Sequence, residues 1–119
     1  MFNKFFVGII FLLSSFFSIA QLHQITFQVD MTNEVISAQG VHIAGDFQSI
    51  AGLGGNWSPS STEVMDDNGD GIYSITVLIP DNTYEYKFIN GNAWGMDESP
   101  PGECSAGPTN TRSLLVNGS

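Results

Sequence analysis

Hydrophobic and polar residues alternate along two long stretches of this chain. Every second residue of QITFQVD (Gln24–Asp30) is apolar, and the same holds for IYSITVLIP (Ile72–Pro80), which stops at a proline. A period of two residues is typical of a strand with one buried face. Both stretches are therefore predicted to be antiparallel strands that each turn one face toward a core.

Further strands are predicted from shorter patterns. GVHIAG (Gly40–Gly45) is bounded by glycines, TYEYKFING (Thr83–Gly91) alternates aromatic and charged residues, and RSLLVN (Arg112–Asn117) is the last such segment. Short strands are also expected near Val64 and Trp94, whereas no segment repeats apolar residues at helical period over ten residues. About seven short strands separated by Gly, Asn and Pro predict an all-β fold, an immunoglobulin-like antiparallel β-sandwich.

The first twenty residues differ in composition from the rest. A basic start, MFNK, precedes the apolar run FFVGIIFLLSSFFSIA (Phe5–Ala20), which ends in small residues. This order is typical of a secretory signal peptide; a retained membrane anchor is the weaker alternative, because the run is short and interrupted by serines. Residues 1–20 are predicted to be a signal peptide, and residues 21–119 one β-sandwich domain that is secreted or held at the cell surface.

The charge of residues 21–119 excludes several partners. This part holds all twelve carboxylates and only two basic side chains, Lys87 and Arg112, so its net charge is −10. Such a surface repels phosphate backbones and anionic lipid, so neither nucleic acid nor a membrane is an expected partner after signal cleavage. Cys104 is the single cysteine; it forms no intramolecular disulfide, and a free thiol and an intermolecular link both stay open.

The sequence offers little for catalysis. Neither His23 nor His42 has a nucleophile motif beside it or the spacing of a metal triad. A glycosidase needs only two facing carboxylates, but twelve acids on a small domain usually form a solvated surface. The chain is expected to be a non-catalytic module, either complete in itself or an accessory region of a larger enzyme such as a glycoside hydrolase.

Two tryptophans and one lysine form the candidate binding site. Trp57 lies in GGNWSP and Trp94 in NGNAWG, in or beside the long irregular stretches 46–62 and 95–111. Lys87 falls on the strand face opposite the aromatic residues and is expected to point to solvent. Indoles cover the C–H faces of a pyranose well, while a lysine and asparagine amides hydrogen-bond its hydroxyls. Tryptophans in small β-domains are more often packed, so the pattern alone leaves both roles open.

The same residues carry a resemblance to known carbohydrate-binding modules. VHIAGDF, GNWSP, GDGIYSITVLIPDNTYEYKFINGNAW and TRSLLV resemble the starch-binding modules of carbohydrate-binding module family 20 and the related glycogen-binding domains of family 48. The resemblance implies an α-glucan site, for starch, glycogen or maltooligosaccharide, made by Trp57 and Trp94 with Lys87 between them. It also implies an asparagine just before an arginine of the last strand. Here Thr111 holds that place, and Asn110 lies one position earlier.

An acidic segment, DDNGDGIY, is a candidate metal site. Asp66, Asn68 and Asp70 stand at alternate positions before a glycine, like the opening of a calcium-binding loop. The twelfth position, where such loops have a bidentate glutamate, is Val77, and a plain hairpin turn requires the same types of residue. Ca²⁺ and a metal-free turn both stay open, and no other cofactor is expected.

Two functions are consistent with these observations. One is an exported, non-catalytic module that binds α-glucan by stacking it on two tryptophans. The other is an immunoglobulin-like adhesion or structural module, stabilised by calcium and without sugar binding. Only the first requires Trp57 and Trp94 to be exposed.

Overall fold

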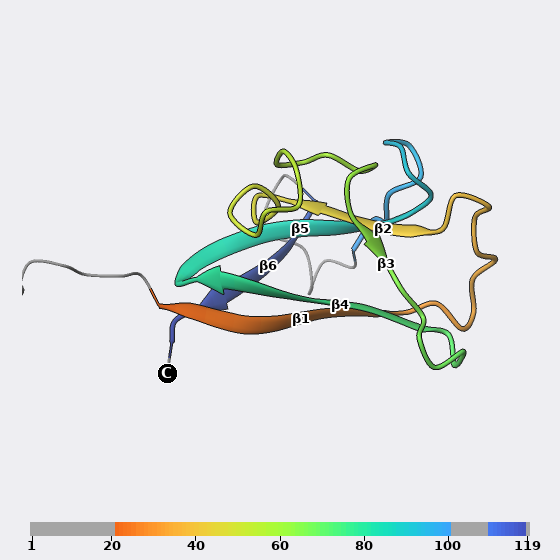
Figure 1. Ribbon diagram of the computed structural model, residues 1–119. Helices are drawn as coiled ribbons and strands as arrows, with labels where there is room; N and C mark the ends of the chain where they lie inside the picture. Colours follow the sequence, from red (N-terminus) through yellow and green to blue (C-terminus); the bar gives the residue numbers. More distant parts are fainter. Residues whose placement is uncertain (1–20, 101–109, 119) are drawn as a thin grey trace, which may run out of the picture.

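The computed structural model describes residues 21–100 and 110–118, and these residues form an all-β fold. Two antiparallel sheets face each other, one pairing β1 with β4 and the other in the order β3-β2-β5-β6 (Figure 1). The strands are β1 (Leu22–Asp30), β2 (Val41–Gly45), β3 (Glu63–Val64), β4 (Ile72–Pro80), β5 (Asn82–Asn90) and β6 (Arg112–Val116). The predicted β-sandwich is therefore confirmed, with six strands in the described part of the chain rather than about seven.

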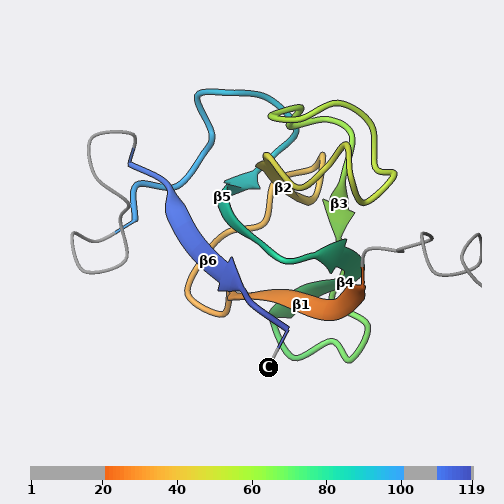
Figure 2. The same ribbon diagram turned by 90° about the vertical axis from the view of Figure 1, so that its left-hand side faces the viewer.

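The register of the strands turns the apolar faces toward each other. In the first sheet Phe27 of β1 lies opposite Ile75 of β4, as the alternation of both segments predicts. In the second sheet β5 is an inner strand between β2 and β6, so Lys87 lies opposite Ala44 of β2. Figure 2 shows the two layers from one end, with β6 crossing beside β1. The lysine thus stands in the middle of a paired strand, which fixes its backbone.

Aromatic rings join the two sheets. The ring of Phe27 stacks on that of Phe47 with centroids 4.7 Å apart, and it meets Tyr86 edge to face at the same distance. Phe47 lies two residues after the end of β2 and is fully buried. Burial of one such side chain contributes roughly 1.5–3 kcal/mol to the free energy of unfolding. The loop that begins at residue 46 is therefore fastened to the core at its start.

The strand that the sequence predicts near Trp94 does not form. Only one isolated bridge, between Ile89 and Asp97, continues the pairing there. Gly91 and Gly95 have φ angles of +143° and +102°, which extended strands of L-residues do not adopt. The segment consequently turns back over β5 as a loop.

Two loops lie over the outer face of the larger sheet, away from β1 and β4 (Figure 1). The Trp57 loop, residues 46–62, connects β2 to β3, and the Trp94 loop, residues 91–98, follows β5. Because β2 and β5 are antiparallel, the loops leave this sheet from opposite ends. Each loop can therefore fold back from its own end of the sheet, so that the two loops meet over the strand that carries Lys87.

Two predictions concern residues outside the described part of the chain. These are the signal peptide at residues 1–20 and the state of Cys104. Within residues 21–100 and 110–118, no helix has the length and apolar character needed to cross a membrane.

Candidate functional site

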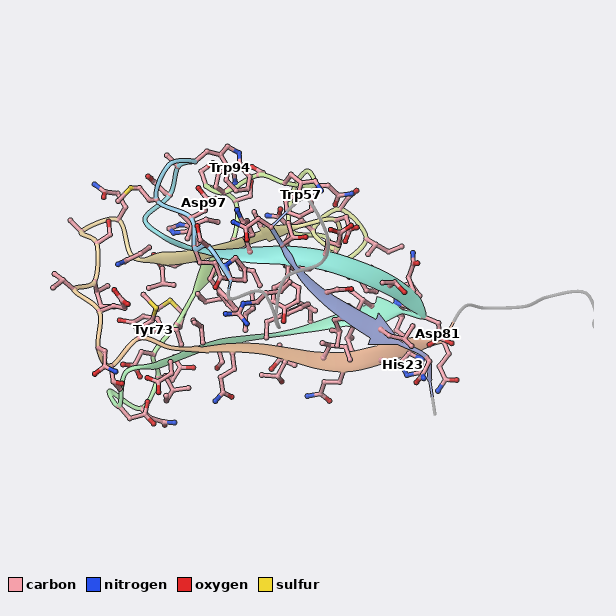
Figure 3. All side chains as sticks on the ribbon, turned by 180° about the vertical axis from the view of Figure 1, so that it is seen from behind. His23, Trp57, Tyr73, Asp81, Trp94 and Asp97 are labelled. Carbon is pink, nitrogen blue, oxygen red and sulfur yellow. The ribbon has the colours of Figure 1, made fainter. Side chains whose placement is uncertain are left out.

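Trp57 and Trp94, which are far apart in the sequence, meet above the β2–β5 sheet. Their ring centroids are 6.4 Å apart and their planes are inclined by 39°. Trp94 is 47% exposed and Trp57 is half-buried. Figure 3 shows both rings beside Asp97, on the side of the molecule opposite β1. They border an open pocket of about 470 Å³, the tryptophan pocket, whose lining residues are Trp57, Glu85, Lys87, Trp94, Asp97 and Thr111.

A buried glutamine determines the shape of the Trp57 loop. Gln48 is 0% exposed, and its side-chain oxygen accepts the backbone N–H groups of Gly45 (3.1 Å) and Ser58 (3.0 Å). Its amide nitrogen donates to the Ser58 carbonyl (2.9 Å) and the Thr62 hydroxyl (3.0 Å). All four hydrogen-bonding positions of the side chain are therefore used. The backbone N–H of Trp57 itself donates to the Gly45 carbonyl at 3.1 Å.

The backbone of Trp57 is strained. Its φ angle is +57°, in the left-handed region, which costs a bulky L-residue roughly 1–2 kcal/mol. Such a conformation persists only where surrounding contacts impose it, and it is more frequent at functional sites than elsewhere. Here Gln48 fixes the next residue, Ser58, and the N–H of Trp57 is held by the Gly45 carbonyl. The loop holds this indole at the edge of the pocket at a cost in conformational energy.

Lys87 is covered rather than solvated, contrary to the expectation from the sequence. Its side chain is 13% exposed, and its Nζ donates to Oδ2 of Asp97 at 2.7 Å. The predicted strand face is correct, since Phe88 and Tyr86 pack toward the core, but the predicted exposure was wrong because strand alternation could not show that the Trp94 loop returns over Lys87. An ammonium group has three N–H donors, so two remain after the contact with Asp97. Lys87 also lines the tryptophan pocket.

Asp97 is a pocket residue that the sequence analysis missed. Its Oδ2 accepts from Lys87, and its Oδ1 accepts the backbone N–H of Gly95, next to Trp94, at 3.0 Å. The hydrogen bond from Lys87, followed by that from Gly95, holds the pKa of the Asp97 carboxyl below its ordinary value. This carboxylate thus stays ionised at neutral pH and links the strand lysine to the loop tryptophan. An Asp ten residues from the lysine, in a loop, offered no pattern to find it by.

The fourth predicted sugar-contact residue, Asn110, is not among the residues that line the pocket. The neighbouring Thr111 lines it instead, and its hydroxyl donates to Oε1 of Glu85 at 2.5 Å. Asn110 has a φ angle of +53°, so the chain turns sharply just before β6. The structure therefore brings together Trp57, Lys87 and Trp94, and it places Thr111 where the resemblance implies an asparagine.

The acidic segment between β3 and β4 forms a hairpin turn. The Asp66 carboxylate accepts the backbone N–H groups of Asp70 (3.2 Å) and Gly71 (2.9 Å), and the latter bond chiefly lowers the pKa of Asp66. Asp70 in turn accepts the N–H of Ile72 at 3.1 Å. Among the described residues, no three His, Cys, Asp or Glu side chains gather as metal ligands would. Calcium held by Asp66, Asn68 and Asp70 stays a prediction.

Comparison with known proteins places this chain beside pullulanases. A family model described as the pullulanase X25 domain matches residues 40–114, which include both tryptophans, Lys87 and Asp97. An amylopullulanase from Thermoanaerobacterium thermosulfurigenes is 44% identical over 54 residues, or 44% of this chain. An amylopullulanase from Thermoanaerobacterium saccharolyticum is 46% identical over an equal length. The chain matches only 3% and 4% of the lengths of these two relatives.

Proposed function

This chain belongs to the pullulanase X25 domain family, and on that premise we propose that it is a carbohydrate-binding module for α-glucans. Trp57 and Trp94 would stack on the sugar rings, and Lys87 would hydrogen-bond their hydroxyls. The names of the two amylopullulanases denote enzymes that act on pullulan, an α-glucan. The family and these names support the choice of polysaccharide class, while the site itself supports the manner of binding.

The observation that carries this proposal is the pair of adjacent, accessible indoles over a lysine. With 47% of Trp94 exposed, an apolar ring faces water where packing would have buried it. The rival adhesion or structural module requires no such exposure. A tryptophan pair of this kind offers two adjoining surfaces to the C–H faces of successive sugars.

The inclination of the two rings favours an α-glucan over a flat polymer. The indole planes differ by 39°, so successive rings of a bound chain must also be inclined to each other. α-1,4-Linked glucose chains curve into helices, whereas β-1,4-linked chains are extended ribbons. A curved chain therefore matches this surface better, whether it is starch, glycogen or a maltooligosaccharide.

The polar groups of the pocket complement the hydroxyls of such a ligand. Two N–H donors of Lys87 supplement the carboxylate acceptors of Glu85 and Asp97. Each stacked ring contributes roughly 1–3 kcal/mol. After the cost of association, two such contacts give a dissociation constant of about micromolar to millimolar.

The carboxylates of the pocket fit binding rather than glycoside cleavage. A catalytic acid needs a raised pKa, whereas Lys87 lowers that of Asp97. Glu85 accepts the hydroxyl of Thr111, and neither His23 nor His42 lines the pocket. The module is therefore proposed to be non-catalytic. It would be exported by residues 1–20 and would act alone or as an accessory region of a glycoside hydrolase.

Isothermal titration of the purified protein with maltoheptaose and β-cyclodextrin tests this function. Trp57→Ala and Trp94→Ala are each expected to raise the dissociation constant about 5- to 150-fold, the equivalent of one stacked ring. Leu115→Ala, which removes an exposed apolar side chain of β6 (62% exposed), is the matched control and should bind as wild type. Cellohexaose, a β-1,4-linked ligand, should release little heat.

The opposite result is equally informative. If folded wild-type protein gave neither heat nor a change in tryptophan fluorescence with maltoheptaose, the sugar-binding function would be wrong. The adhesion or structural module would then be the function to test, beginning with calcium.

A further inference from the structure

The two basic side chains of residues 21–119 both form ion pairs with carboxylates of the Trp94 loop. Lys87 of β5 pairs with Asp97 at 2.7 Å, and Arg112 of β6 pairs with Glu98. The second pair is bidentate, because Arg112 donates through Nε and through a terminal nitrogen, each at 2.8 Å. This part of the sequence has twelve carboxylates, yet the two cations pair with two carboxylates that are neighbours in the sequence, one each. We call Asp97 and Glu98 the acidic pair.

The acidic pair fixes the Trp94 loop at its returning end. Oε2 of Glu98 accepts the backbone N–H of Phe88 at 3.0 Å, and the N–H of Glu98 donates to the Phe88 carbonyl at 3.0 Å. Oδ1 of Asp97 accepts the N–H of Gly95, the residue after Trp94. The side chains of both ion pairs are only 13–28% exposed. Hydrogen-bonded pairs with this little exposure resist screening better than pairs at an open surface.

Backbone contacts close the base of this loop, where the N–H of Asn90 donates to the Met96 carbonyl at 3.1 Å and Ile89 bridges to Asp97, but the tip that carries Trp94 has weaker support. Trp94 is 47% exposed, so its own packing contributes little, and the loop contains Gly91 and Gly95 at positive φ. Without side-chain anchors such a segment samples many conformations, and fixing each residue on binding costs about 1–2 kcal/mol. A ligand that stacks on Trp94 would then bind more weakly, because part of its binding free energy would be offset by the entropy cost of ordering the loop.

We propose that Asp97 and Glu98 are positioning residues that hold Trp94 against Trp57 and so preorganise the tryptophan pocket. They act on Trp94 through the backbone of the loop and the two cations. The effect on glucan affinity rests on the proposed function, whereas the effect on the position of Trp94 does not. Lys87 then has two roles, one toward the acidic pair and one toward the ligand, and its substitution removes both.

The position of Trp94 can be measured without any sugar. Trp57→Phe leaves Trp94 as the single tryptophan, since the sequence has two. In that background Asp97→Ala and Glu98→Ala are expected to make Trp94 fluorescence more accessible to acrylamide. Asp67→Ala, which removes an exposed carboxylate from the β3–β4 turn, should leave it unchanged. Asp97→Asn, which keeps the shape of the side chain, serves if a larger truncation prevents folding.

Affinity is then measured with Trp57 present. Asp97→Ala is expected to raise the dissociation constant of maltoheptaose about 10- to 100-fold, the equivalent of one charged hydrogen bond. The double variant Lys87→Met/Asp97→Ala should not make Trp94 more accessible than Asp97→Ala alone, because both remove the same contact.

The two proposals fail separately. If folded Asp97 and Glu98 variants leave the quenching of Trp94 unchanged, the positioning role is wrong, whatever the protein binds. If quenching rises while wild type binds no glucan, the acidic pair positions Trp94 and the sugar-binding function is wrong.

Discussion

The two loops that carry the tryptophans are held by different kinds of contact. The Trp57 loop is organised by a buried neutral amide, Gln48, whose four hydrogen bonds are all to uncharged groups. The Trp94 loop is held by two ion pairs, Lys87–Asp97 and Arg112–Glu98, that are partly exposed. The first loop is thus fixed from the inside, as part of the core, and the second from its surface. Apart from Asp46, whose carboxylate accepts the N–H of Glu85 at 2.9 Å, one wall of the pocket is therefore held by uncharged hydrogen bonds and the other by ion pairs, so the second wall should respond more strongly to pH and salt.

The largest effect is expected from breaking the buried amide. Gln48→Ala leaves the backbone N–H groups of Gly45 and Ser58 without their acceptor, and the Thr62 hydroxyl keeps only a long contact of 3.5 Å with the Leu53 carbonyl. With each unsatisfied group costing about 1–3 kcal/mol, the free energy of unfolding should fall by about 3–5 kcal/mol. Urea denaturation measures this, with Gln28→Ala on the exposed face of β1 as control. A loss below about 1 kcal/mol would show that the network is not what shapes the loop.

The second-largest effect is expected from acid, which should affect the Trp94 loop more than the Trp57 loop. The folded-state pKa of Asp97 lies below its ordinary value of 3.8. Its ion pair therefore stabilises the loop at neutral pH, and this contribution is lost as the pH falls through the folded-state pKa. Titration from neutral pH to well below the ordinary pKa of Asp97 should alter the fluorescence of Trp94 in Trp57→Phe more than that of Trp57 in Trp94→Phe.

Several charged groups surround Asp97, so the titration needs its own reference. Lys87, Glu85, Glu98 and Arg112 all lie near the Trp94 loop or the pocket. Asp97→Asn removes only the group in question, and the difference between the two curves reports Asp97. Identical curves would mean that this carboxylate does not hold the loop.

A smaller effect should distinguish the backbones of the two tryptophans. Trp57 has a left-handed φ angle and Trp94 is not among the residues with positive φ. Trp57→Gly should therefore be more stable than Trp57→Ala by about 1 kcal/mol, because glycine adopts that conformation without strain. At Trp94 the order should reverse, with glycine less stable than alanine by roughly 0.4–1 kcal/mol. Thermal or urea unfolding of the four variants gives both differences.

The smallest effect is that of salt. Raising NaCl from about 0.02 to about 0.5 M should weaken the ion pairs of the Trp94 loop by a few tenths of a kcal/mol. Acrylamide quenching of Trp94 should rise slightly, while that of Trp57 should not change. A larger response at Trp57 would contradict the division between the two loops.

The sequence predicted the strands well because alternation reports directly which face is buried. β4 has the predicted bounds, Ile72–Pro80, and β5 is displaced by one residue. The strand near Trp94 was predicted wrongly, since two glycines at positive φ turn the chain there. That a loop tryptophan from each region meets Lys87 was implied by a family resemblance rather than by any pattern.

The residues that shape the site left no local signal in the sequence. Gln48 stands in a stretch rich in Gly and Ser, where a polar residue is expected at the surface, yet it is fully buried. Asp97 and Glu98 are two acids among twelve, and only the folded chain shows that they meet both cations. These contacts form only when the loops fold back over the sheet, and the periodicity of the sequence carries no information about how the loops fold.

The pairing of both cations inside the domain bears on selection among polysaccharides. With Lys87 and Arg112 engaged by the acidic pair, and no other Lys or Arg in residues 21–119, an approaching polymer meets a strongly anionic body. Uronate, sulfate or phosphate groups on a polysaccharide would be repelled before any ring could stack. The proposed carbohydrate-binding module would therefore favour neutral glycans over acidic ones through its overall charge.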